Sequence, residues 1–143
     1  MHVAQILKEK GSRVVTTTAD ATIADAARTL RRERIGAILV TNDDGTPAGI
    51  ISERDIVRGL ADTGASLLEK HVADLMTRSL FTCAPSATVE AVMEEMTSGR
   101  CRHIPVLEDN VVVGMISIGD VVRSRVDTLE SESDQLKNYI VNP

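Results

Sequence analysis

Hydrophobic residues recur along this chain with a helical period and with a strand period, and the order of these segments is written twice. Two predicted helices, which begin after Thr22 and Thr88, carry apolar residues with the i, i+3, i+4, i+7 spacing of one helix face. These residues are Ile23, Ala26, Ala27 and Leu30 in the first helix and Val89, Val92, Met93 and Met96 in the second.

The segments around these helices repeat as well. Each helix is followed by an apolar run, at 35–40 and at 101–106, which predicts a buried strand. A polar turn and a further strand then predict a hairpin. Short strands are expected at 15–18 and 81–84, and the segments His2–Leu7 and His71–Met76 precede them with similar sequences. Each unit therefore reads helix, strand, helix, strand, strand, helix.

A unit of about 60 residues buries too little apolar surface to be stable alone, so we expect the two copies to share a core. The predicted fold is α/β (α+β), with two βαββα repeats packed about a pseudo-two-fold axis and clefts between them. The first repeat with its N-terminal helix covers 1–65, the second covers 66–126, and a C-terminal helical extension covers 127–143. Residues 61–70 form the linker and the start of the second unit.

The extension is polar, yet it carries a seam of apolar residues. Val122, Val126, Leu129, Leu136 and Ile140 fall on alternating steps of three and four if Ser133 fills the missing place. This spacing is typical of a helix that packs on a partner subunit, although the seam covers fewer than three heptads. An amphipathic helix that folds back on its own chain fits the same pattern.

The same corner occurs once in each repeat, where a strand opened by glycine ends at a serine and an aspartate follows three residues later. The corners are Gly49, Ser52 and Asp55 in the first copy and Gly114, Ser117 and Asp120 in the second. Free amides at the start of a helix attract a phosphate, and a carboxylate accepts hydrogen bonds from ribose hydroxyls. Ser-x-x-Asp is also a capping box that only satisfies its own helix.

Composition removes several classes of function. The net charge is −5 and the 16 Lys and Arg are scattered, so the basic surface that duplex nucleic acid needs is missing. No apolar run reaches the roughly 20 residues of a membrane span, and we expect a cytoplasmic protein. The cysteines Cys83 and Cys101 form no Cys-x-x-Cys pair, and the three histidines show no metal-ligand spacing, so we expect no metal site.

No known catalytic motif occurs in the sequence. A nucleophile elbow, a phosphate-binding Gly-Lys-Ser/Thr loop and a His-Glu-x-x-His pair are all missing. Hydrolysis of a nucleotide at Asp55 or Asp120 would need further carboxylates to hold a metal ion, and we find none in the pattern. We therefore expect neither catalytic residues nor a catalytic cofactor.

With the duplication and both corners in place, the chain resembles a tandem pair of CBS domains, named for cystathionine β-synthase, over about residues 3–126. The most specific strings are residues 48–57, 102–106 and 114–122. The resemblance implies binding of adenine nucleotides (AMP, ADP, ATP, NAD or S-adenosylmethionine) in two clefts between the repeats. It also implies that pairs dimerise, in a head-to-head or head-to-tail disc.

The resemblance further implies which residues bind. Asp55 and Asp120 would hold a ribose, and Ser52 and Ser117 would lie by the phosphate. The base would contact aliphatic side chains and main chain, because Phe81 and Tyr139 are the only aromatic residues. The base-contacting residues are Val14, Ile35, Gly36 and Met115 for one cleft, and Leu80, Cys101, Arg102 and Ile50 for the other.

The repeats differ in where they place positive charge. Arg54 aligns with Gly119, and Arg102 aligns with Gly36. Arg54 either reaches a phosphate in its own cleft or forms a surface ion pair with Glu53 or Asp55. Arg102 and His103 either contact the ligand or make a structural bond across the sheet. Because Gly119 lacks a cation, strong phosphate binding is less expected at the second cleft.

These patterns favour a regulatory sensor whose occupied clefts change the packing of repeats or subunits and signal to an effector protein that the sequence does not name. Two other functions stay open. The chain could be a constitutive dimerisation scaffold whose corners are only caps, or a thiol- or metal-responsive switch that uses Cys83 and Cys101.

Overall fold

A computed structural model describes residues 1–141, and Asn142 and Pro143 of the expected extension lie outside the described residues. The elements, in chain order, are α1 (Val3–Lys10), β1 (Thr16–Thr17), α2 (Ile23–Glu33), β2 (Ala37–Thr41), β3 (Pro47–Ser52), α3 (Glu53–Thr63), η1 (Ala65–Glu69), η2 (Val72–Asp74), α4 (Val89–Gly99), β4 (His103–Glu108), β5 (Val111–Ser117) and α5 (Ile118–Val141). The predicted mixed α/β class is confirmed.

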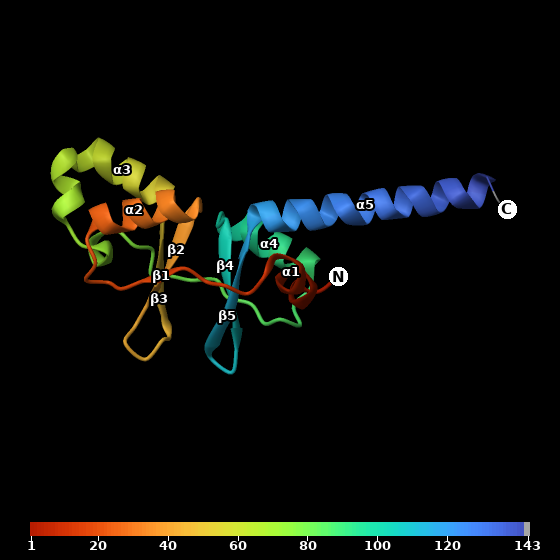
Figure 1. Cartoon of the computed structure of the whole chain (residues 1–143), viewed down its shortest axis with the longest axis horizontal. Helices are drawn as coiled ribbons and strands as arrows, with labels where there is room; N and C mark the ends of the chain where they lie inside the picture. The colour runs from red at the N-terminus through yellow and green to blue at the C-terminus, as the bar shows by residue number, and fades with distance from the viewer. Residues whose placement is uncertain (142–143) are drawn as a thin grey trace.

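The duplicated sequence forms two similar lobes that lie side by side (Figure 1). In the first, β1, β2 and β3 form one sheet, with β1 parallel and β3 antiparallel to β2. In the second, β4 and β5 form the predicted hairpin, and the expected strand at 81–84 is reduced to a single parallel bridge between Cys83 and Val106. Both predicted hairpins are therefore present, and the outer strand of the second lobe is shorter.

The caps of the two central helices follow from equivalent residues. The Thr22 hydroxyl accepts a hydrogen bond from the Asp25 amide at 3.1 Å, and Thr88 accepts one from the Ala91 amide at the same distance. A threonine that caps the N-terminus stabilises a helix by satisfying an amide that has no partner within it. The predicted starts of both helices are confirmed.

Each lobe receives a segment from the other repeat. Val3, Ile6 and Leu7 of α1 are buried in the core of the second lobe, where they pack with α4, β4 and β5. Val72 and Met76 are buried in the core of the first lobe. The backbone follows the same exchange, because the Val3 amide donates to the Ala87 carbonyl at 2.9 Å and the Val72 amide donates to Ala21 at 2.8 Å.

Sequence order and packing thus divide the chain differently. The N-terminal helix belongs to the first repeat in sequence and to the second lobe in space, while Leu67 of the linker is buried in the first core. The division at residue 65 stays a prediction about sequence repeats. The two lobes complete each other's cores and form one unit.

The corner strands begin earlier than expected, at Pro47 and Val111, so the glycine lies within each strand and does not open it. This glycine is needed for the exchange. A Cβ at Gly49 would lie 2.7 Å from the Thr77 carbonyl oxygen, and a Cβ at Gly114 would lie 2.5 Å from Leu7 Cδ2. Both distances are below any ordinary contact, so the exchanged segments pass directly over a backbone that lacks a side chain. This explains why both copies of the corner begin with glycine.

Candidate functional site

The first corner joins β3 to α3 through Ser52. The Ser52 amide donates to Asp55 Oδ2 at 2.9 Å, the Asp55 amide donates to Ser52 Oγ at 3.2 Å, and the two side chains meet at 3.0 Å. These bonds form the reciprocal capping box that the sequence allows. The two bonds that the carboxylate accepts both use Oδ2, and within residues 1–141 no hydrogen bond is made to Asp55 Oδ1. The carboxylate caps its helix and keeps one oxygen for another donor.

The second corner has the same local geometry between β5 and α5. The Ser117 amide donates to Asp120 Oδ2 at 2.9 Å, and the Asp120 amide donates to Ser117 Oγ at 3.2 Å. Asp120 is more deeply placed than its counterpart, since only 8% of it is exposed. Both predicted corners therefore form, and each presents its carboxylate at the start of a helix.

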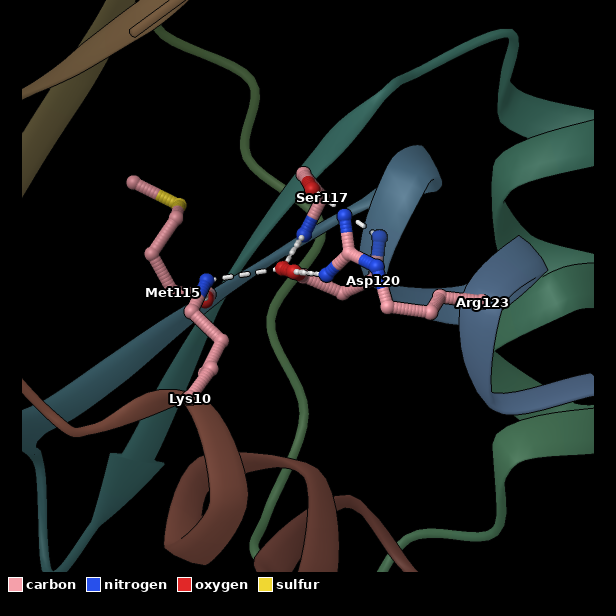
Figure 2. Close-up of polar contacts among 5 residues, drawn as sticks. All are labelled: Lys10, Met115, Ser117, Asp120 and Arg123. Carbon is pink, nitrogen blue, oxygen red and sulfur yellow. Dashed lines mark hydrogen bonds and ion pairs between the residues drawn. The ribbon is translucent and has the colours of Figure 1, made fainter. Parts of the chain in front are cut away.

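A lysine from the other repeat closes the second corner (Figure 2). Lys10 Nζ, at the end of α1, donates to Asp120 Oδ2 at 2.7 Å and to the Met115 carbonyl at 2.8 Å. Arg123 lies 3.6 Å from the other carboxylate oxygen. Asp120 is thus shared between two cations, whereas no salt bridge is made by Asp55 in the described part of the chain. We refer to the Lys10 contacts with Asp120 and Met115 as the Lys10 latch.

Burial and these partners set the charge of the second corner. Burial alone raises the pKa of the Asp120 carboxyl, but the hydrogen bonds from Lys10 and Ser117 outweigh it and leave the pKa below its usual value. Burial also lowers the pKa of His103, and Lys10 and Arg102 add to that effect against the opposing influence of Asp120 and Glu53. At neutral pH the corner holds an ionised aspartate and a neutral histidine.

The structure brings several predicted residues from the two repeats together. The His103 ring lies against Gly36, where an added Cβ would meet its Cε1 at 3.7 Å. His103 also pairs across the hairpin with Ser117. The Gly36 carbonyl accepts from the Glu53 amide at 3.0 Å, and the Arg102 carbonyl makes the equivalent bond with Ile118 at 2.8 Å. The start of each buried strand is therefore tied to the helix of its own corner.

The aliphatic candidates occupy partly buried positions, neither closed into a core nor fully in solvent. They are Val14, Ile35, Ile50, Leu80, Cys101 and Met115. Ile50 is held by a backbone pair with Thr77, with both hydrogen bonds at 2.9 Å. Partial exposure is what a wall for a flat base requires, and the assignment of these residues to a ligand stays a prediction.

The charged candidates differ between the corners as the sequence indicates. Arg54 is exposed and makes no ion pair with Glu53 or Asp55 within residues 1–141, so the ion-pair interpretation is not supported. Arg102 is exposed as well. A Cβ at Gly119 would meet only Ser117 Oγ, at 3.7 Å, so there is room for a larger side chain.

Sequence reasoning missed Lys10. No motif contains it, and the position that follows from aligning His2 with His71 holds Ser79, which carries no charge. The signal becomes visible only when α1 is known to cross to the other lobe. A lysine on the last turn of a helix otherwise indicates no more than a favourable interaction with the helix dipole.

Two surface hollows lie away from the corners. One is lined by Arg28, Arg31, Arg32 and Arg34 on and after α2. The other is lined by residues of the loops 18–20 and 41–44, three of which are aspartates that would repel a phosphate. Neither contains a predicted site residue. We give the corners more weight because they combine a carboxylate, helix amides and apolar walls, whereas both hollows are open surfaces.

Other chemistry receives little support from the described residues. Burial raises the pKa of the Cys83 thiol to about 11 and also raises that of Cys101. Because the thiolate is the reactive form, these thiols are poor sensors at neutral pH. Within residues 1–141, no group of three or more His, Cys, Asp or Glu side chains is placed to hold a metal ion. In the same range, no helix is both long and apolar enough to cross a membrane.

Known proteins are similar to this chain in sequence and in structure. A family model described as "CBS domain" matches residues 3–62 and 72–127. The mitochondrial CBS domain-containing protein CBSX3 of Arabidopsis thaliana is 36% identical over 146 residues, which cover 96% of this chain and 71% of that protein. The crystal structure of the CBS-domain containing protein ATU1752 from Agrobacterium tumefaciens matches with a TM-score of 0.85 and 44% identity, over 87% of this chain and 99% of that one.

A third relative was solved with ligands. The CBS domain pair of protein MJ0100, in complex with 5-methylthioadenosine and S-adenosyl-L-methionine, matches with a TM-score of 0.80 and 26% identity. The match covers 90% of this chain and 98% of that one. Both of those ligands contain adenosine.

Proposed function

The chain belongs to the CBS-domain family, and from that premise we propose that it is a non-catalytic regulatory module that binds adenine nucleotides in the clefts between its repeats. The resemblance predicted from the two Ser-x-x-Asp corners is confirmed, and so is the packing of two repeats. The ligand we propose is AMP, ADP, ATP or NAD.

The observation that carries the proposal is the free oxygen of Asp55. Its Oδ2 completes the helix cap, while Oδ1 accepts no hydrogen bond within residues 1–141. A ribose supplies two donors to a carboxylate, and a phosphate is attracted to the positive end of a helix dipole. Arg54, exposed and next in sequence, is a suitable partner for the phosphate.

The ligand class also has support from a relative. The MJ0100 pair, whose chain is covered almost completely, was solved with two adenosine compounds. A protein with only two aromatic residues has to hold an adenine by aliphatic contacts and backbone groups. The partly buried candidates on both sides of the repeat interface, such as Ile35 and Met115, are of this kind.

We further propose that the two clefts differ in affinity. A ribose that binds Asp120 has to compete with Lys10, which already donates to the carboxylate and to the Met115 carbonyl. Displacing a charge-assisted hydrogen bond costs free energy that the first corner does not lose. The cleft at Asp55 is therefore the stronger site, and binding at Asp120 releases the end of α1.

Release of α1 gives the signal a physical route. Lys10 ends the helix whose Val3, Ile6 and Leu7 fill the core of the second lobe, so moving it alters how the two lobes pack. A ligand shifts such an equilibrium only by its difference in affinity for the two arrangements. We propose that the protein acts in the cytoplasm as a homodimer and passes the change to an effector protein.

Calorimetric titration with AMP, ADP, ATP and NAD tests the proposal. We expect Asp55→Ala to remove the stronger site and Asp120→Ala to affect only the weaker one. The matched control is Asp74→Ala, because Asp74 Oδ2 accepts from the His71 amide at 3.0 Å in the same type of cap and no ligand is proposed there. No heat with any nucleotide, or equal affinity in wild type and Asp55→Ala, would overturn the proposal.

A second candidate, a constitutive scaffold, is favoured by the completeness of the two caps. If the corners are only structural, Asp55→Ala lowers stability by about 0.5–2 kcal/mol, as the loss of a cap does, and no ligand changes the unfolding midpoint. Thermal unfolding with and without each nucleotide distinguishes the two, because a ligand that binds only the folded protein raises the midpoint.

A further inference from the structure

The second half of α5 has no packing partner among residues 1–141. This helix runs for 24 residues, and its buried residues, Asp120, Val121 and Ser124, all lie in the first two turns. Every residue from Leu129 to Val141 is exposed, and the helix extends away from both lobes (Figure 1). Helices in water obtain most of their stability from packing one face, so a projecting helix of this length needs a partner.

The solvent-facing side of α5 carries an apolar stripe, interrupted at Ser133, which we call the α5 seam. It consists of Val122, Val126, Leu129, Leu136 and Ile140, with side chains between 45% and 69% exposed. At 100° per residue, the buried pair Val121 and Ser124 lies roughly 130° around the helix from this seam. The helix therefore rests on its own lobe with one face and presents the seam to solvent.

The residue types on the α5 seam fit a two-stranded parallel coiled coil. The steps of four and three place Val126 and Ile140 at heptad position a, and Leu129 and Leu136 at position d. β-branched residues at a with leucine at d favour parallel dimers over larger assemblies. Ser133 occupies the remaining a position, and a single polar residue there weakens the dimer while limiting it to one register.

The flanking charges select this same chain as the partner. In a parallel in-register pair, position g faces position e of the next heptad on the other helix, so Glu132 faces Lys137 and Arg125 faces Glu130. Arg125 also lies 3.5 Å from Glu90 of its own chain, so the pair of Glu132 with Lys137 carries more of the argument. Both contacts join opposite charges, and symmetry makes each of them twice. An antiparallel pair centred on the seam would instead bring each Glu130 and each Glu132 against its own copy.

We infer that the α5 seam is a homodimer interface, in which the C-terminal helices of two copies form a short parallel coiled coil. This gives the proposed homodimer a defined contact and places both C-termini at the same end of the assembly. It does not depend on nucleotide binding. It requires only the exposed seam and the pattern of charges beside it.

Sedimentation equilibrium of the full chain tests the contact. Leu136→Asn puts an amide at the centre of the seam, and we expect it to weaken the dimer roughly 100-fold. Ser131→Asn is the matched control, because it introduces the same side chain on the outer face of the same helix and should leave the dimer unchanged. A monomeric wild type at 200 μM would overturn the inference, and so would a Leu136→Asn dimer of wild-type affinity.

The parallel orientation of the two helices is tested by charge substitutions and by cross-linking. Lys137→Glu should weaken the dimer about two- to fivefold at low salt, and Glu132→Lys with Lys137→Glu should restore it. Ile140→Cys, in a chain with Cys83 and Cys101 changed to serine, should form an intermolecular disulfide, and Asn138→Cys should not. The parallel arrangement would be overturned if Lys137→Glu alone made the dimer tighter. It would also be overturned if the Ile140→Cys variant dimerised without forming the disulfide.

Calorimetry on the same Leu136→Asn variant separates this inference from the proposed function. We expect its first cleft to bind nucleotide, since the substitution lies far from both corners on an exposed helix. A protein that dimerises through the seam but binds no nucleotide contradicts only the sensor. A nucleotide-binding monomer contradicts the seam and the proposed homodimer, but not the nucleotide site.

Discussion

The two corners have the same motif and the same cap geometry, yet only one of them is closed by a foreign cation. In the described part of the chain Asp55 accepts hydrogen bonds only from its own capping serine, whereas Asp120 also binds Lys10 at 2.7 Å and is buried. A duplicated sequence thus gives two sites of different character because the exchanged segments differ. The second corner lies against α1, and the lysine at the end of that helix holds its carboxylate. The carboxylate of the first corner has no such contact within residues 1–141.

Removing each carboxylate is expected to have the largest effect and to separate the corners most clearly. Asp120→Ala deletes a cap and leaves Lys10 without its partner, so we expect it to lower the free energy of unfolding by about 2–3 kcal/mol. Asp55→Ala deletes only a cap and should cost about 1 kcal/mol. Urea unfolding of the two variants measures the difference, and equal losses would mean that the Lys10 latch contributes nothing to stability.

Removing the lysine should make the second corner resemble the first. Lys10→Met keeps the apolar stem and deletes the charge, so a ribose no longer competes for Asp120. We expect the affinity of the second cleft to rise about 3–10-fold, which corresponds to about 0.7–1.4 kcal/mol, while the first cleft is unchanged. Calorimetry resolves the two sites. A fall in affinity at the second cleft would mean that Lys10 binds the ligand and does not compete with it.

Moving the arginine between the corners is expected to have a smaller effect. Gly119→Arg places a guanidinium where the first corner has Arg54, in a position with open space. We expect the second cleft to bind ATP about two- to fivefold more tightly, the size of an exposed charge contact. Arg54→Gly should weaken the first cleft by a similar factor. Adenosine, which has no phosphate, is the control ligand and should respond to neither substitution.

The pH dependence of stability gives the smallest of the expected effects and tests the half-buried histidine of the second lobe, His103. The pKa of His103 is below its ordinary value of 6.5 in the folded protein, so the unfolded chain takes up a proton first as the pH falls. The stabilisation from a neutral His103 is complete above about pH 6.5 and is lost as the pH falls through the folded pKa. Urea midpoints at pH 7.5 and 5.5 should therefore differ less in His103→Gln.

The control for this experiment is His71→Gln, because His71 is exposed. It should keep the wild-type difference between the two pH values. If His103→Gln and wild type lose the same stability between pH 7.5 and 5.5, the burial of the ring is not the cause of the pH dependence.

The repeats, hairpins and corners could be predicted from sequence because each depends on residues close together in the chain. Apolar spacing identified α2 and α4, and Ser52 and Ser117 identified where a helix starts after a strand. For the C-terminal extension, the sequence predicted a helix but left open whether it packs on a partner subunit or folds back on its own chain. The structure excludes folding back, since the residues after Thr128 are exposed.

The second N-terminal segment shows where local similarity fails. His71–Met76 resembles His2–Leu7, but it forms only the short turn η2, whereas the first copy forms an eight-residue helix. The first copy continues with Lys8, Glu9 and Lys10, which favour helix, while the second continues with Thr77, whose backbone pairs with Ile50. The backbone pair of Thr77 with Ile50 joins the two repeats and ends the second segment before a helix forms. This contact cannot be predicted from the local sequence of either segment.

The placement of α1 also matters during synthesis on the ribosome. The helix α1 leaves the exit tunnel about 100 residues before β4 and β5, the strands that cover it. At 5–20 residues per second, its apolar face waits roughly 5–20 s for its binding surface. The apolar face of α1 is therefore covered late, and a nascent chain halted before β5 exposes this helix to chaperones and proteases.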